Sequence, residues 1–304
     1  MSPLAKLLSV GLAILLVSCL LTPQIYLGMQ SLSGWPLFDW LSEFPFHRYF
    51  SRVLQVTTLV AVIPLLLWMR IWRPSELGLE KNSRALADGA AGFAGALVPG
   101  IILSAALIGA GAFRLRDEWE LMPLFRIFLT AGFVSCLEEF LFRGVFLGLA
   151  MRAMGAWKAA VAVSLAFAAV HFLRPSRVAD SGEVTWLSGF KQAFSFMSGL
   201  PDPWVLVFAL ATLFFAGLLL AWVTLRTRSL WLAIGIHAGW ILGQQGLNWL
   251  AKYRIKPPDE WLPWVGPSVV SGAVPTGFFS LLALAVTGLA VFAYLKSSRR
   301  NVGF

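Results

Sequence analysis

Eight long apolar runs dominate the sequence and limit what it can fold into. Each one approaches the roughly 20 residues that a helix needs to cross the hydrocarbon core of a membrane. The composition agrees, because 58% of the residues are hydrophobic, only 13% are charged, and the mean hydropathy is +0.76. We therefore expect an integral membrane protein, with spans at residues 4–30, 52–69, 85–113, 127–150, 157–173, 204–225, 230–250 and 277–295.

The continuity of these runs predicts the fold class. Strands of a barrel alternate apolar and polar residues at a period of two, and these runs do not, so helices are the economical way to satisfy the backbone. We expect an all-α, polytopic helical bundle with about eight transmembrane helices, forming a single membrane domain over residues 1–304. Gly89, Gly92 and Gly95 make the third run suited to close helix packing.

The net charge of +9 does not indicate a nucleic-acid partner, because the basic residues are scattered over loops instead of gathered on one face. The lipid bilayer is the expected partner. Lys and Arg near span ends favour the cytoplasmic side, and here they are divided almost evenly between alternate loops. A slight excess predicts that both termini are cytoplasmic, in a multi-pass protein of a bacterial inner membrane.

Three charged residues lie inside the run 127–150, where charge is expensive. Glu138, Glu139 and Arg143 fall within two helical turns, and a charge at bilayer depth costs on the order of 3 kcal/mol. Glu139 and Arg143 are four residues apart, so they share one helix face and can pair. Glu138 points about 100° away and is available for other contacts. The pattern predicts a functional site, with an ion pair beside it.

Two of the three histidines also lie within spans. His171 in 157–173 and His237 in 230–250 reach depths that overlap with that of Glu138, counted at about 1.5 Å per residue. Phe167 precedes His171 by four residues, which predicts an aromatic ring directly under the imidazole. Around His237 further polar groups face the same cleft, namely Gln244 on the same stripe and Trp240 beside it.

These residues resemble the motifs of a known family. The segments are Glu-Glu-Phe-Leu-Phe-Arg-Gly at 138–144, Phe-Ala-Ala-Val-His at 167–171 and His-Ala-Gly-Trp at 237–240. They are similar to the EExxxR, FxxxH and HxxxN motifs of the CAAX prenyl protease and bacteriocin-processing family, the ABI or Rce1-like intramembrane endopeptidases. The resemblance covers about 127–250, and it implies a multi-helix bundle that holds its site within the membrane.

The resemblance also implies roles for the individual residues. Glu138 and His171 would orient and deprotonate a water molecule, and His237 would stabilise the tetrahedral oxyanion. Glu139 and Arg143 would support them. One position departs from the pattern, because Ile241 stands where the family has the Asn of HxxxN. Either Trp240 Nε1, Gln244 or water supplies the missing donor, or the protein has kept the fold and lost the activity.

Other functions remain open from the sequence. Two Glu and two His are a possible zinc set, but no HExxH is present and Arg143 disfavours a dication, so we expect no cofactor and keep a metalloprotease as the minor alternative. A proton-coupled transporter would also place Glu and His at the midplane. An inactive scaffold or immunity protein of the same fold is the third alternative. For a protease, we expect a membrane-anchored or hydrophobic peptide as substrate, with 174–203 as a lid that contacts it.

Overall fold

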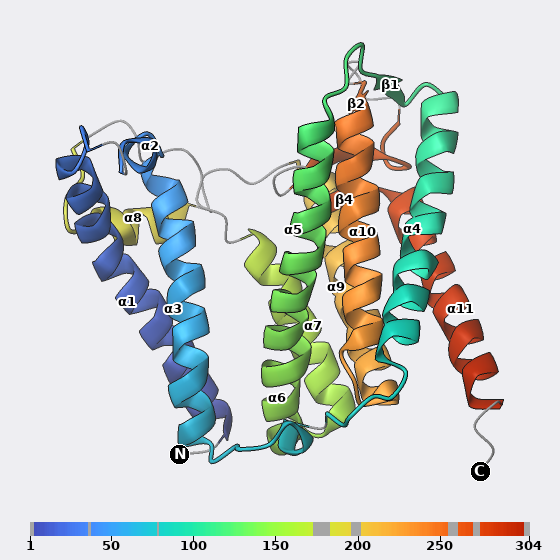
Figure 1. The fold of residues 1–304 in the computed structure, drawn as a ribbon, viewed down its shortest axis with the longest axis horizontal. Coiled ribbons are helices and arrows are strands. Elements are labelled where there is room, and N and C mark those ends of the chain that lie inside the picture. The colour runs from blue at the N-terminus through green and yellow to red at the C-terminus, as the bar shows by residue number, and fades with distance from the viewer. Residues whose placement is uncertain are drawn as a thin grey trace. The chain divides into compact units, whose positions relative to one another are not determined.

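The computed structural model is a set of long helices in the order expected from the apolar runs (Figure 1). It describes residues 3–35, 38–77, 79–172, 183–195, 202–254, 261–269 and 274–300. Eight helical segments coincide with the eight predicted runs: α1 (Pro3–Ser31), α3 (Phe46–Trp68), α4 (Ala85–Gly109), α5 to α6 (Leu121–Met154), α7 (Ala156–Phe172), α9 (Pro203–Thr227), α10 (Trp231–Leu250) and α11 (Phe278–Arg300). The all-α, polytopic fold is confirmed.

Six of these segments are long and apolar enough to cross a membrane by length and composition, among the residues that the structure describes. They are α1, α3, α4, the continuous α5–α6 segment, α9 and α11. Helix α7 is shorter, with 17 residues, and α10 has 20 residues but carries His237 and several amides that lower its hydropathy. Only 11% of the most apolar window of α5–α6 is buried, so most of that window is exposed.

The chain divides into two compact units, and each is described by itself. The core unit contains Arg73–Ala169 and Pro201–Phe304, and the hairpin unit contains Met1–Trp72 and Val170–Leu200. The division passes through the last turn of α7, so Phe167 belongs to the core unit and His171 to the hairpin unit. The expectation of one membrane domain over 1–304 stays a prediction.

Close packing of α4 against α10 forms the centre of the core unit. A Cβ atom added to Gly235 would lie 2.1 Å from the carbonyl oxygen of Gly89, and one added to Gly239 would lie 2.6 Å from that of Phe93. A Cβ on Gly92 would similarly meet Leu232 O at 2.4 Å. Only glycine allows backbones to approach this closely, so the predicted close packing is confirmed at Gly92, whereas Gly95 makes only ordinary contacts with α11.

Short strands join the helix ends of the core unit. Strand β1 (Phe113–Leu115) pairs antiparallel with β2 (Ala251–Tyr253), which directly follows α10 (Figure 1). Strands β3 (Gly266–Val269) and β4 (Val274–Thr276) form a second antiparallel pair before α11. Short helical turns complete the elements, namely η1 (Pro74–Leu77) and the π-helix η2 (Phe140–Phe146) between α5 (Leu121–Glu139) and α6 (Leu147–Met154).

The hairpin unit consists of α1 and α3 with two short helices, α2 (Asp39–Ser42) and α8 (Ser188–Phe194). Helix α8 packs directly on α1, since a Cβ atom on Gly189 would lie 1.9 Å from the carbonyl oxygen of Cys19. Trp186 and Phe194 remain largely exposed. The predicted lid at 174–203 therefore includes a helix seated on α1, and its residues 174–182 and 196–201 lie outside the described part of the chain.

Candidate active site

The candidate site begins where the backbone changes from an α-helix to a π-helix. Glu138 and Glu139 are the last residues of α5, and Arg143 lies within η2. π-Helical turns are rare and occur frequently at functional sites, because the wider turn redirects the side chains on either side of it. The charged motif therefore coincides with a local change of helix geometry that the sequence pattern does not reveal.

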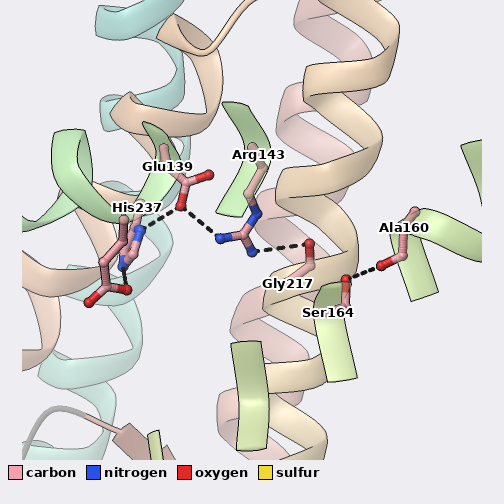
Figure 2. Close-up of polar contacts among 7 residues, drawn as sticks. Glu139, Arg143, Ala160, Ser164, Gly217 and His237 are labelled. Carbon is pink, nitrogen blue, oxygen red and sulfur yellow. Dashed lines mark hydrogen bonds and ion pairs between the residues drawn. The ribbon is translucent and has the colours of Figure 1, made fainter. Parts of the chain in front are cut away.

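Glu139 and Arg143 form a fully buried ion pair (Figure 2). The Arg143 Nη1 atom lies 3.1 Å from Glu139 Oε1, and neither side chain is exposed. A second nitrogen, Arg143 Nη2, donates to the carbonyl oxygen of Gly217 on α9 at 3.3 Å. The guanidinium also lies over the Phe167 ring, 4.2 Å from its centroid. The predicted pair is confirmed. The Arg143 guanidinium contacts the Glu139 carboxylate, the Gly217 carbonyl and the Phe167 ring.

The absence of a side chain at Gly217 makes this arrangement possible. A Cβ atom there would lie 3.1 Å from Ser164 Cβ and 3.3 Å from Phe167 Cδ1, so α9 and α7 approach closely at this level. Ser164 turns its hydroxyl back onto its own helix and donates to Ala160 O at 2.7 Å (Figure 2). The close approach brings the Gly217 carbonyl within reach of Arg143.

His237 joins the same carboxylate from α10. Its Nδ1 lies 2.8 Å from Glu139 Oε1 (Figure 2), and its side chain is 10% exposed. An ionised carboxylate only accepts hydrogen bonds, so this contact requires the proton of the imidazole on Nδ1. A carboxylate partner of this kind fixes the orientation and tautomer of a histidine. Nε2 is consequently the nitrogen directed away from Glu139.

Glu138 lies next to that second nitrogen. Its Oε2 is 3.9 Å from His237 Nε2, which is longer than a hydrogen bond, and its side chain is 25% exposed whereas that of Glu139 is fully enclosed. Two adjacent carboxylates therefore have different surroundings. Glu139 contacts both Arg143 and His237, while Glu138 keeps a quarter of its side chain exposed, with its Oε2 atom buried.

The structure gives some sequence-predicted residues partners that were not foreseen. The His237–Glu139 hydrogen bond was missed, since matching depths indicated only proximity, and the Gly217 carbonyl left no signal at all in the sequence. Phe167 was expected to wall His171. Its ring packs edge-on to His237, with the centroids 6.0 Å apart, and beneath Arg143. Its contacts in the core unit make it a spacer between the cation and the imidazole. The expected contact with His171 stays a prediction.

The residues proposed to replace the family Asn differ in their surroundings. Trp240 Nε1 donates to Thr287 Oγ1 of α11 at 3.4 Å, and its ring packs against the apolar cluster around Leu232 and Ile236. The indole N–H is thus engaged with α11. Ile241 and Gln244 are half-buried on the face of α10 that bears His237.

His171 lies in the last turn of α7 and is half-buried. It belongs to the hairpin unit, whereas Glu138, Glu139, Arg143 and His237 belong to the core unit. The pairing of His171 with Glu138 stays a prediction. Within the described ranges, no group of three or more His, Cys, Asp or Glu side chains is placed to hold a metal ion, and metal dependence also stays a prediction.

Comparison with known proteins gives one family. Residues 118–242 match the Rce1-like family, described as type II CAAX prenyl endopeptidase Rce1-like. The matched segment contains Glu138, Glu139, Arg143, His171 and His237 and overlaps most of the predicted core at 127–250. Neither the curated proteins nor the solved structures contain a significant match to the chain.

Proposed function

We propose, on the premise that residues 118–242 are an Rce1-like domain, that this chain is an intramembrane endopeptidase with a glutamate-activated water. At the level of the family, the domain is of the CAAX-protease type. The observation that carries the finer proposal is the approach of Glu138 Oε2 to His237 Nε2, beside a carboxylate already neutralised by Arg143. Peptide hydrolysis needs a base and an oxyanion donor at one place, and these two groups supply that combination.

Glu138 is the proposed general base. A quarter of its side chain is exposed, and hydrolysis requires a group that can take a proton from water. In the proposed step, Glu138 accepts a proton from water while the oxygen adds to the carbonyl carbon. The same proton then passes to the leaving amine nitrogen as the C–N bond breaks. His171 is the proposed partner of Glu138 in orienting the water.

His237 is the proposed oxyanion donor. Because Nδ1 faces Glu139, donation to an oxyanion from Nε2 requires a proton on both ring nitrogens, so the proposed step needs His237 to act as an imidazolium. The positive charge is stabilised by Glu139 on one side and by the nearby Glu138 on the other. Arg143 pairs with Glu139, which contacts His237, and thereby positions His237 without touching the substrate.

The remaining expectations accompany this proposal. The substrate is a membrane-anchored or hydrophobic peptide, and the reaction takes place without a cofactor in a bacterial inner membrane, with both chain termini cytoplasmic. The test is cleavage of a panel of membrane-anchored peptides by the purified full chain, with and without a chelator. Cleavage that persists with chelator and is lost in Glu138→Gln supports the proposal. Cleavage that disappears with chelator and returns with zinc would replace it by the metalloprotease.

Ile241 favours a second candidate, an inactive scaffold or immunity protein of the same fold. The experiment that separates the two is Ile241→Asn, which restores the family pattern. One well-placed oxyanion donor is worth on the order of 3 kcal/mol, so a protein that lacks only this donor should gain turnover. No cleavage by the wild-type chain and none by Ile241→Asn, with both correctly folded, would leave the scaffold as the function.

A further inference from the structure

A polar hollow of about 690 Å³ lies at the far end of the two helices that carry Glu138 and His237. It is lined by Pro123 and Ile127 of α5 and by Gln245, Asn248 and Trp249 of α10. The hollow also includes residues of the segment that joins β1 to α5. It therefore lies over the seam between α5 and α10, where both helices end beside the β1–β2 pair (Figure 1).

The hollow is aligned with the candidate active site. Ile127 precedes Glu138 by eleven residues on α5, and Asn248 follows His237 by eleven residues on the antiparallel α10. At 1.5 Å per residue, each helix places the hollow about 16 Å from the Glu138–His237 pair. An extended peptide spans that distance with about five residues. A substrate that has its scissile bond at Glu138 can reach the hollow with its flank.

The charge available in the hollow is negative. Two carboxylates and one guanidinium line the hollow, and the guanidinium of Arg116 is directed to the C-terminus of α10, where its Nε and Nη2 donate to the carbonyl oxygen of Asn248 at 3.0 and 2.9 Å. Glu118 and Glu120 also line the hollow, and both are exposed. Among the residues that the structure describes, neither of these carboxylates forms an ion pair.

The rim is held in place by backbone and indole contacts. Trp249 Nε1 donates to Glu120 O at 2.9 Å, and the backbone N–H of Arg116 donates to Leu250 O at 3.0 Å. Trp119 Nε1 adds a longer contact of 3.3 Å to Leu250 O. Tryptophans at helix ends are typical of the boundary between lipid and water. The hollow is thus a built feature at that boundary.

We propose that this hollow is a substrate subsite that binds a basic flank of a membrane-anchored peptide, about five residues from the scissile bond. The proposal rests on the proposed function, because it places the flank relative to Glu138. Glu118 and Glu120 attract the Lys or Arg side chain, and the Gln245 and Asn248 amides bind the polar backbone that leaves the membrane. The pairing selects for substrates whose apolar segment ends in positive charge.

Direct binding tests the subsite independently of cleavage. The full chain in phosphatidylcholine nanodiscs is titrated with two fluorescent single-span peptides, which differ only in three Lys or three Glu just outside the apolar segment. We expect the Lys peptide to bind more tightly. Glu118→Gln and Glu120→Gln should each weaken it by about fivefold or less, the range for an exposed ion pair. Asp117→Asn removes a charge from the same loop outside the hollow and should leave binding unchanged.

A second variant separates occupation of the hollow from a general charge effect. Ile127→Trp fills the hollow and should weaken the binding of both peptides. If the two peptides bind equally, or if Asp117→Asn acts like the other two changes, the subsite is wrong. If phosphatidylethanolamine abolishes the preference for the Lys peptide, the hollow binds a lipid amine and the subsite proposal is also overturned.

Cleavage measured on the same peptides distinguishes the subsite from the proposed function. Cleavage without discrimination between Lys and Glu flanks would overturn the subsite and leave the endopeptidase. If the chain cleaves neither peptide but binds the Lys peptide more tightly in a way that depends on Glu118 and Glu120, the endopeptidase is overturned and the subsite stands. If both hold, Glu118→Gln and Glu120→Gln should raise KM for the Lys peptide more than they lower kcat, because the flank is remote from the reacting bond.

Discussion

The core unit contains two ion pairs close in sequence to the two ends of α5, and their surroundings are opposite. Arg114 and Asp117 precede the helix, lie 3.4 Å apart and are 64% and 86% exposed. Glu139 is the last residue of the helix and Arg143 follows it in η2; the two side chains lie 3.1 Å apart and are fully buried. Solvent screens most of the attraction between the two exposed charges, so this pair adds little to the free energy of unfolding. The buried pair cannot be separated without leaving a charge in a medium that does not solvate it.

The comparison also extends to the two adjacent glutamates. Glu139 is enclosed and makes contacts to Arg143 and His237, while Glu138 has a quarter of its side chain exposed. The same Glu→Gln change should therefore have a structural consequence at one position and a chemical one at its neighbour. We expect the largest effects from changes to the most deeply buried side chains.

The largest effect is expected from Glu139→Gln. It leaves Arg143 buried without its carboxylate and should lower the free energy of unfolding by about 3 to 5 kcal/mol. SDS titration of the purified protein in mixed micelles measures this loss. The double variant Glu139→Gln with Arg143→Met removes both charges and should recover part of the stability. Wild-type stability in the single variant would contradict a structural role for the pair.

Glu138→Gln should act on turnover and spare the fold. Removal of a general base typically costs about 100-fold in rate, and Gln keeps the size and hydrogen-bonding capacity of the partly exposed side chain. His171→Ala is expected to behave in the same way. His47→Ala, near the start of α3, serves as the matched histidine control. The rate of peptide cleavage and the midpoint of thermal unfolding are measured for each variant. Full activity of Glu138→Gln would show that Glu138 is not the base.

A smaller effect is expected from the donor side chains on α10. Gln244→Leu should slow cleavage by about fivefold if its amide assists the oxyanion, since a net neutral hydrogen bond is worth about 1 kcal/mol. Trp240→Phe should leave the rate unchanged, because the indole N–H is directed to Thr287. Steady-state kcat values for the two variants provide the measurement. A slow Trp240→Phe with a normal Gln244→Leu would reverse the assignment.

The smallest effect is expected from the exposed pair. Arg114→Gln should change the free energy of unfolding by less than about 0.5 kcal/mol, because both side chains are well solvated. The same SDS titration used for Glu139→Gln allows direct comparison. A loss as large as that at Glu139 would mean that the exposed pair is buried by lipid or by another part of the chain.

The sequence by itself determined the membrane class, the position of the helices and the Glu139–Arg143 pair. These features follow from local rules, since apolar length sets a span and a spacing of four residues sets a shared helix face. The high cost of charge at bilayer depth also predicts a function for Glu138.

Only the tertiary structure decided which helices bring partners to those residues. The Gly217 carbonyl reaches Arg143 because α9 and α7 pack closely, and His237 reaches Glu139 because α10 is held against α4 by glycines. The tertiary structure likewise decided the π-helical turn and the hollow between the ends of α5 and α10. Each depends on the register between elements far apart in the chain, which is set by the packing of many side chains and has no local sequence signal.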